Sequence, residues 1–492
     1  MLADGEVDAE RPRQHALIED AARTPSVLAA FRLGILGVLA IALLPSCGAA
    51  LTGPQPTRPG DRAPGANDLV GARVAHEAET GTAAESLPFL HDDYGRALAE
   101  AKRTKRPLFV DAWAPWCHSC QSMRAYVLTD PSLSPLAKDF VWLSIDTEKD
   151  TNSAWVGRFP NRVWPTLWVI DPALNEPIMR YEGTATAAEL VSLLGAVRDM
   201  SGQGHAADKL FLHGSQAAAR RELSEAANSY ASALMHRDFA GRPRVVEALI
   251  GLHALRQDFT ACTDLAVAEM AALPPGTSRA TVLATGLSCA REAKREADLH
   301  KLEVAAEKAA LDSDPRAVAD DRSALFEELV ETKKARGDLK GAKAMAHTWA
   351  TFLEAAAARA PTHQARAVFD AHRLAAYIAA GEAERAVAML TLSEREFPAD
   401  YNPPARLARA YLETKRLDDA KAAIERAASR VYGPRSLRVY GLAADIAKAR
   451  ADVAGERAAL EQAVARTASV TLNENQKKLR ADLEKRLRDL PR

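Results

Sequence analysis

The sequence has little of several features that would point directly to a function. Its 64 basic and 65 acidic residues leave a formal net charge of −1, which gives no whole-chain reason to expect nucleic acid. Aromatic residues make up only 6%, and there are five cysteines. The apolar run at 33–44 has 12 residues, too few to cross about 30 Å of hydrocarbon as a helix. With 48% hydrophobic and 26% charged residues in 492, the chain is expected to form two or three globular domains.

A signal for export precedes these domains. The apolar run "LGILGVLAIALL" has the length of the h-region of a secretory signal. The "LPSC" that ends at Cys47 resembles the lipobox of bacterial lipoproteins, which implies lipid modification of Cys47 and a periplasmic, membrane-anchored bacterial protein. We expect a signal sequence over 1–46 and a flexible proline- and glycine-rich linker over 47–86. An uncleaved anchor and an ordinary signal peptide remain the alternatives.

Strands and helices alternate between residues 87 and 200. Hydrophobic periodicity predicts helices over 92–106, 117–127 and 186–200, and strands over 107–113, 140–146, 166–171 and 178–183. This order predicts an α/β domain over 87–200, with a central mixed sheet flanked by helices.

Two cysteines with two residues between them follow the first of these strands, and the pair fits two chemistries. A zinc site commonly needs four ligands, and Cys117, His118 and Cys120 offer three with no evident fourth. Cys262 and Cys289 lie in a different segment, 27 residues apart. We therefore expect a redox-active dithiol with no metal and no cofactor.

The segment "VDAWAPWCHSC" resembles the active-site segment of the thioredoxin superfamily. Asp111 lies six residues before Cys117, where thioredoxins place a buried carboxylate, and Trp116 immediately precedes the first cysteine. Pro165, in "VWPT", lies 48 residues beyond Cys117 and matches the loop whose proline is cis in thioredoxins. The likeness covers about 87–200 and is greatest to the periplasmic branch, which includes domains of bacterial thiol:disulfide interchange proteins.

The resemblance implies a distinct role for each residue. Cys117, at a helix N-terminus that favours the thiolate, would be the attacking nucleophile. Cys120 would resolve the mixed disulfide, and Asp111 would accept its proton. His118 either tunes the thiolate or is simply solvated. The expected substrate-binding residues are Trp116, His118, Trp164 and Pro165.

From about residue 216 the chain consists almost entirely of helix formers with short polar turns between them. The turns at Gly381, Lys415 and Ala451 are 34 and 36 residues apart. This pattern resembles tetratricopeptide repeats, which have a period of about 34 residues. It implies an all-helical solenoid over 216–490, after a linker over 201–215. Such a solenoid exposes a concave surface that binds protein or peptide, the alternative being a purely structural helical domain.

Two cysteines fall on neighbouring predicted helices of this solenoid. Cys262 occupies a slot that Ala342, Ala386 and Ala420 fill in other units. Cys262 and Cys289 are either two buried thiols or a structural disulfide, and the sequence leaves both open.

Two functions from different classes follow. The first is a membrane-tethered periplasmic thiol:disulfide oxidoreductase with a Cys-His-Ser-Cys dithiol. It would act on protein disulfides or dithiols and exchange electrons with an upstream thiol partner, while the repeats recruit a client or redox partner. The alternative is a non-enzymatic protein-binding or assembly lipoprotein in which the repeats are the working part. The intact cysteine pair favours the first.

Overall fold

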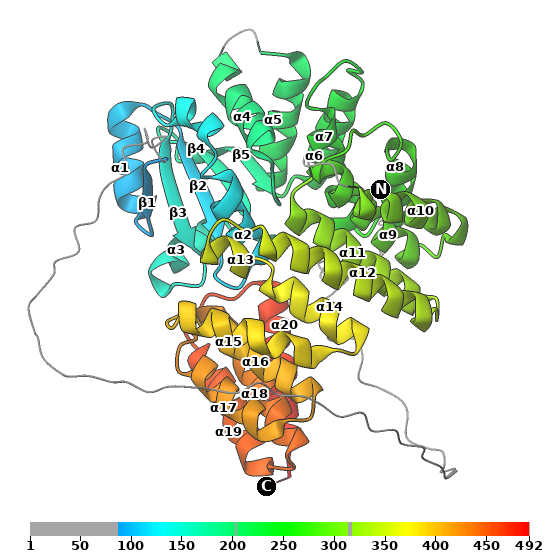
Figure 1. Ribbon diagram of the computed structural model, residues 1–492. Helices are drawn as coiled ribbons and strands as arrows, with labels where there is room; N and C mark the ends of the chain where they lie inside the picture. Colours follow the sequence, from blue (N-terminus) through cyan, green and yellow to red (C-terminus); the bar gives the residue numbers. More distant parts are fainter. Residues whose placement is uncertain (1–86, 202–203, 313–316, 492) are drawn as a thin grey trace, which may run out of the picture. The chain divides into compact units, whose positions relative to one another are not determined.

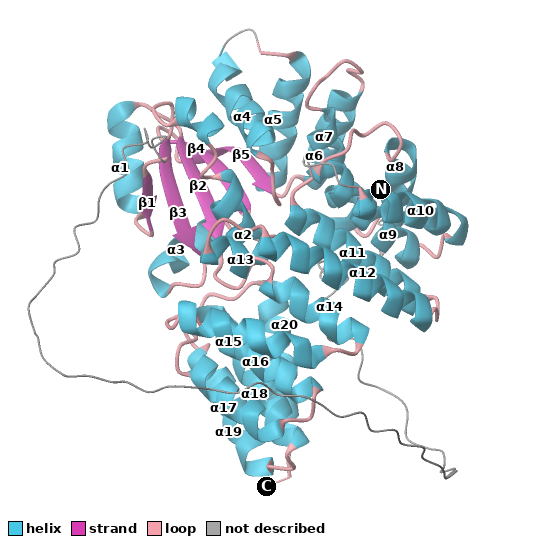
Figure 2. Ribbon diagram, in the orientation of Figure 1, coloured by secondary structure: helices cyan, strands magenta, loops and turns pink. Residues whose placement is uncertain are grey.

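The structure is a computed structural model that describes residues 87–201, 204–312 and 317–491. Its strands form one five-stranded sheet, and the elements after the sheet are helical (Figures 1 and 2). The predicted signal sequence, linker 47–86 and Cys47 lie outside the described residues. Within the described ranges, no helix is both long enough and apolar enough to cross a membrane.

The sheet has the predicted mixed character. Its strands are β1 (Phe89–His91), β2 (Leu108–Trp113), β3 (Val141–Asp146), β4 (Thr166–Asp171) and β5 (Glu176–Glu182), in the order β1-β3-β2-β4-β5. Strands β1, β3 and β2 are parallel, β4 is antiparallel to β2, and β5 is antiparallel to β4. Every residue of β3 is buried, because helices cover both faces of the parallel part of the sheet.

The domain has the three predicted helices and also three short helices that were not predicted from the sequence. Its helical segments are α1 (Tyr94–Thr104), α2 (His118–Ser122), η2 (Pro131–Leu136), η3 (Asp150–Asn152), α3 (Ser153–Arg158), α4 (Ala187–Arg198) and η4 (Asp199–Ser201). The short helices that were not predicted are η2, η3 and α3. The helix expected over 117–127 is α2 followed by one π-helical turn, η1 (Met123–Val127). Thr186 begins α4 with a capping box to Glu189, which satisfies backbone donors at that helix end.

The predicted linker over 201–215 is wrong. Helix α5 (Ala206–Ala219) begins inside it and packs against β5, the edge strand of the sheet. The Ser215 hydroxyl donates to the carbonyl of Arg180 and accepts from its N–H at 2.7 and 2.8 Å. Phe211 and Leu212 of α5 join the core of the sheet domain. An edge strand exposes unpaired backbone groups, and α5 covers those of β5. Because α5 also contributes to the core of the sheet domain, no flexible linker separates that domain from the helices that follow.

The remaining helices form the solenoid. They are α6 (Leu223–Leu234), α7 (Arg242–Leu255), α8 (Phe259–Glu269), α9 (Thr277–Glu292), α10 (Glu296–Leu311), α11 (Ala319–Ala335), α12 (Leu339–Ala358), α13 (His363–Ala367), α14 (Asp370–Ala380), η5 (Ala383–Arg385), α15 (Ala386–Glu396), α16 (Asn402–Glu413), α17 (Leu417–Ala428), η6 (Gly433–Arg435), α18 (Ser436–Ala449), α19 (Val453–Arg466) and α20 (Glu474–Asp489).

The polar turns that the sequence repeats are the points where helices end. The residues at these turns all have positive φ: Gln257, Gly337, Gly381, Lys415 and Ala451. A left-handed residue stops a helix and lets the next one fold back against it. The left-handed residues at these turns therefore separate the helices that pack against one another in the solenoid.

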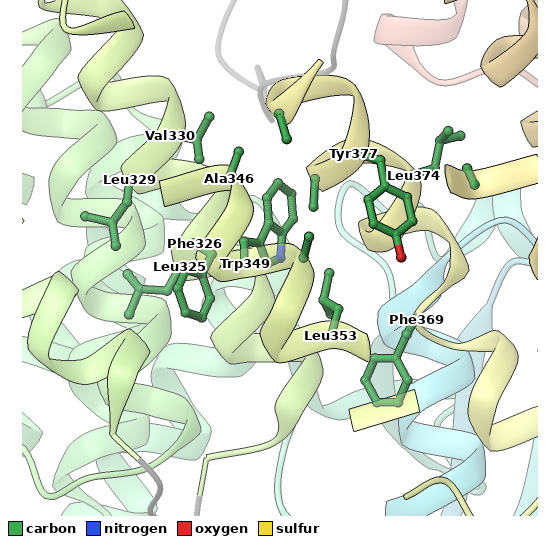
Figure 3. Close-up of a cluster of buried hydrophobic side chains, with 14 of the residues drawn as sticks. Leu325, Phe326, Leu329, Val330, Ala346, Trp349, Leu353, Phe369, Leu374 and Tyr377 are labelled. Atoms are coloured by element: carbon green, nitrogen blue, oxygen red, sulfur yellow. The ribbon is translucent and has the colours of Figure 1, made fainter. Parts of the chain in front are cut away.

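Small and large apolar side chains interlock between the helices. Trp349 of α12 is buried among residues of α11 and α14, and its indole N–H donates to the Ser323 hydroxyl at 2.6 Å (Figure 3). Nearer the start of the solenoid, Cys262 of α8 and Cys289 of α9 form a disulfide with a Cα separation of 6.1 Å. Of the two alternatives that the sequence left open, the structure has the disulfide.

Candidate functional site: a dithiol between the two domains

The cysteine pair lies where β2 leads into α2. Cys117 is the N-cap residue of α2, and its Sγ accepts a hydrogen bond from the Cys120 N–H at 3.0 Å. The two cysteines form a disulfide with a Cα separation of 5.2 Å. Cys117 is 5% exposed and Cys120 is fully buried. The first cysteine is therefore the one that another molecule can reach, and the helix N-terminus there favours its thiolate.

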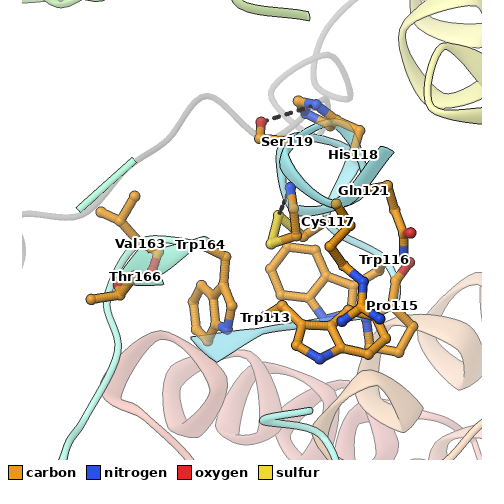
Figure 4. Close-up of a disulfide and its surroundings, with 12 residues drawn as sticks. Trp113, Pro115, Trp116, Cys117, His118, Ser119, Gln121, Val163, Trp164 and Thr166 are labelled. Carbon is orange, nitrogen blue, oxygen red and sulfur yellow. Dashed lines mark hydrogen bonds between the residues drawn. A yellow bond between two sulfur atoms is a disulfide. The ribbon is translucent and has the colours of Figure 1, made fainter. Parts of the chain in front are cut away.

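Three tryptophans surround the pair. Trp113, Trp116 and Trp164 pack against the cluster that contains both cysteines (Figure 4). The rings of Trp116 and Trp164 meet edge to face with centroids 5.2 Å apart, and the Trp164 indole N–H donates to the Thr147 hydroxyl at 2.8 Å. The Trp164–Pro165 peptide bond is cis, as the resemblance predicts. These contacts hold the predicted substrate-binding side chains beside the disulfide.

Asp111 is buried in β2, opposite Ser144 on β3. Neither carboxylate oxygen has a hydrogen-bond partner within the described parts of the chain. The only cation in an ion pair with Asp111 there is Arg124, whose Nη1 lies 3.8 Å from Oδ2. Burial raises the pKa of Asp111 to about 6, although the Arg124 guanidinium acts to lower it. A carboxyl group with this pKa exchanges protons close to neutral pH, as a proton acceptor must.

Sequence reasoning missed Arg124. Its guanidinium lies over the Trp113 ring, 4.0 Å from the centroid, and donates to the Ser144 hydroxyl at 2.9 Å. The residue comes from the π-helical turn η1, seven positions after Cys117. A lone basic residue in an otherwise apolar helix segment was the available signal. The Arg124 guanidinium therefore has two partners besides Asp111, the Trp113 ring and the Ser144 hydroxyl.

Asp111→Asn is expected to change both stability and rate. The folded pKa of about 6 exceeds the ordinary value of 3.8, so folding favours the protonated acid. That contribution is complete below about pH 4 and is lost as the pH rises through about 6, a change of about 3 kcal/mol. The variant should therefore match the wild type near pH 4 and be more stable near pH 7. Its disulfide exchange near pH 7 should be at least tenfold slower, mainly at the step in which Cys120 resolves the mixed disulfide.

Urea unfolding of the full chain, followed by tryptophan fluorescence, would measure the stability change. Six of the seven tryptophans (113, 116, 142, 155, 164 and 168) lie in the sheet domain, so the signal reports on that domain. Asp139→Asn is the matched control, because Asp139 is a surface carboxylate paired with Arg198. An unchanged exchange rate would remove Asp111 from the mechanism, and a stability gain that does not depend on pH would contradict the raised pKa.

The solenoid contacts the loops that carry the site. The Asn402 side chain donates to the Pro115 carbonyl at 3.1 Å, and the Arg435 guanidinium lies over the Trp116 ring at 5.1 Å. The Glu148 carboxylate accepts from the Trp116 indole N–H at 2.9 Å and from the Arg435 backbone N–H at 2.7 Å. Burial raises the pKa of Glu148 to about 7.

Gly433 makes this approach possible. It has a φ of +60°, and a Cβ atom there would lie 2.0 Å from the Glu148 carbonyl oxygen. Only glycine fits this turn, because both the backbone conformation and the available space exclude a side chain. The repeats therefore form part of the surroundings of Trp116, beside the cysteine pair.

His118 has partners that the sequence did not reveal. Its imidazole contacts Asp320 of α11 and His372 of α14, which are 202 and 254 residues away along the chain. Burial opposes the charged form of His118, but the Asp320 carboxylate outweighs it and raises the pKa of His118. Burial lowers the pKa of His372 to about 4, and the charge on His118 adds to that effect. His118 is therefore not simply solvated, because its side chain joins the sheet domain to the solenoid.

Comparisons with known proteins agree with this architecture. Residues 90–172 match the family model described as thioredoxin-like, and residues 377–446 match a model of the tetratricopeptide repeat. The chain therefore contains a thioredoxin-like domain followed by tetratricopeptide repeats, and these two predicted resemblances are confirmed.

Curated relatives match only part of the chain. The thiol:disulfide interchange protein DsbD of Vibrio vulnificus (strain CMCP6) is 32% identical over 59 residues, which is 12% of this chain and 10% of that protein. Thioredoxin M4, chloroplastic, of Arabidopsis thaliana is 32% identical over 102 residues, 20% of this chain and 48% of that protein. A solved tetratricopeptide repeat protein from Parabacteroides merdae aligns with a TM-score of 0.36 at 11% identity, covering 56% of this chain and 98% of that one. The cysteine pair and the first two similarities support a thiol redox role.

Proposed function

We propose that the protein is a thiol:disulfide oxidoreductase that acts on protein disulfides or dithiols. The observation that carries the proposal is the cysteine pair at the start of α2, with Cys117 at the N-cap and Cys120 buried behind it. In the forward direction the Cys117 thiolate attacks a client disulfide and releases one client thiolate. Cys120 then attacks the Sγ of Cys117, gives its proton to Asp111 and releases the second client thiolate. The client is reduced by two electrons, and the pair becomes the disulfide that an upstream dithiol partner must reduce.

The repeats are proposed to recruit the client or the redox partner. Helical repeats of this kind present extended surfaces that bind protein. The contacts of Asn402 and Arg435 with Pro115 and Trp116 support this role, because they place the repeats at the edge of the dithiol. A client that reaches Cys117 would therefore meet both domains.

Insulin reduction by the full chain tests the proposal. The reduced wild type should accelerate it under limiting dithiothreitol, and the double variant Cys117→Ser/Cys120→Ser should match the rate without protein. If the wild type were no faster than the double variant, the non-enzymatic assembly protein would be the better description.

We also propose that a lipid on Cys47 tethers the protein to a bacterial membrane on its periplasmic side. The support is the short apolar run that ends at the lipobox-like "LPSC". Cys47→Ala is expected to move the protein from the membrane fraction to the soluble fraction and to abolish labelling by radioactive palmitate. Cys262→Ala/Cys289→Ala is the matched control and should remain membrane-bound. Continued pelleting of Cys47→Ala, with no label on the wild type, would contradict the lipoprotein assignment.

A further inference from the structure

Three side chains from distant parts of the chain converge beside the dithiol. They are His118 of α2, Asp320 at the start of α11 and His372 in the first turn of α14. His118 Nδ1 lies 3.0 Å from both carboxylate oxygens of Asp320 and 3.1 Å from His372 Nε2. His372 Nε2 lies 3.4 Å from Asp320 Oδ1. His118 Nδ1, Asp320 Oδ1 and His372 Nε2 therefore lie within 3.4 Å of one another.

Pairwise hydrogen bonds account for only part of this arrangement. Four polar atoms lie within 3.1 Å of His118 Nδ1, because the Ser119 hydroxyl is there too (Figure 4). A ring nitrogen has either one proton to donate or one lone pair to accept with, so it can serve only one of them well. The contact between two imidazole nitrogens needs that same site. A shared partner for the three residues accounts for the geometry better than pairwise bonds do.

A divalent cation fits the three atoms. Zinc binds imidazole nitrogen and carboxylate oxygen at about 2.0–2.2 Å, and tetrahedral coordination then separates the ligand atoms by about 3.3 Å. The observed separations of 3.0, 3.1 and 3.4 Å bracket this value. Two imidazoles and one carboxylate are also a ligand set that first-row divalent metals prefer over calcium or magnesium.

The surroundings are those of a site with one open side. Asp320 and His372 are buried, whereas the His118 side chain is 31% exposed. Glu327 Oε2 lies 3.9 Å from His372 Nδ1, on the ring nitrogen that faces away from the cluster, and the Trp349 ring packs at 5.8 Å. A carboxylate near a ligating histidine raises the basicity of the ring, and at 3.9 Å Glu327 acts through its charge. Three protein ligands leave a position for water or for a group from another molecule.

We propose that His118, Asp320 and His372 bind a first-row divalent cation of the zinc class. The cation would fasten α11 and α14 of the solenoid to the first turn of the helix that begins at Cys117. It would also neutralise the buried Asp320 carboxylate without requiring a charged histidine.

Metal titration of the full chain tests this proposal independently of thiol activity. The purified protein carries Cys47→Ala, its affinity tag is removed and both disulfides are oxidised, so that no thiolate can bind metal. It is stripped with a chelator and titrated with Co²⁺ and Zn²⁺. Equilibrium dialysis with metal analysis should give one ion per chain, and Co²⁺ should develop the visible absorption of a low-coordinate site. His372→Ala, Asp320→Asn and His118→Ala should each lower the affinity at least tenfold.

His363→Ala is the matched control, because His363 is a solenoid histidine that is 69% exposed and pairs with Glu396 outside the cluster. The His363→Ala variant should bind Co²⁺ and Zn²⁺ with the affinity of the wild type. Circular dichroism checks that each variant is folded, and the partly exposed His118 supplies a variant that leaves the buried core untouched. Absence of stoichiometric binding to the wild type would overturn the proposal, as would affinities in the His118→Ala variant equal to those of His363→Ala.

Discussion

A Cys120→Ser variant is expected to accumulate mixed disulfides with client proteins, at least tenfold more than a Cys117→Ser variant. Cys117 is the accessible cysteine and caps α2, so it forms the covalent link to the client. Without Cys120 no intramolecular thiol can break that link. Cys117→Ser leaves only the fully buried Cys120, which a client disulfide cannot approach. Acid quenching, alkylation and non-reducing gel electrophoresis of whole cells would measure the trapped species.

The double variant Cys117→Ser/Cys120→Ser is the control for this experiment, because it retains the Cys262–Cys289 pair and the same fold. It sets the level of adducts that arise elsewhere in the chain. Equal trapping by both single variants, or none above this control, would argue that the thioredoxin-like domain is a docking module. The non-enzymatic alternative would then describe the protein.

Removal of the solenoid disulfide should destabilise the repeats by about 3.5 kcal/mol, if loop-closure entropy dominates. The bond joins residues 27 positions apart, on helices α8 and α9 within the core of the solenoid. Cys262→Ala/Cys289→Ala is the suitable variant, because other units place alanine in the slot of Cys262. Denaturant unfolding followed by far-ultraviolet circular dichroism would measure the change, since most of the helix lies in the repeats.

Cys117→Ser/Cys120→Ser removes the same number of sulfur atoms, but the disulfide that it removes joins residues only three positions apart. The loss of unfolding free energy in this variant should therefore be clearly smaller. A reducing agent should lower the stability of the wild type by more than that of the alanine variant, in which only the Cys117–Cys120 bond remains to be reduced. Equal stabilities of the wild type and Cys262→Ala/Cys289→Ala under oxidising conditions would contradict a stabilising bond.

Features that depend on neighbouring residues were predicted well from the sequence. The strand of residues 108–113 and the helix after Cys117 follow from one apolar run and one cysteine motif. The solenoid turns at Gly381, Lys415 and Ala451 were recognised by spacing, and each has the left-handed backbone that ends a helix. These features can be read from short stretches of sequence, because hydrophobic periodicity shows in windows of about 11–18 residues and helix capping acts within about one turn.

The tertiary structure decided the features that depend on residues far apart. Residues 206–219, most of them in the predicted linker, form helix α5, which packs against β5. Strand β5 is an edge strand because of the order of the strands in the sheet, and the amino-acid sequence does not show that order directly. Arg124 pairs with Asp111 only because η1 lies across the sheet. His118, Asp320 and His372 meet because the solenoid brings two of its helices to the first turn of α2. Contacts between residues 200 or more positions apart produce no periodicity or spacing that can be read from the sequence. They arise only when the helices of the solenoid pack against the sheet domain.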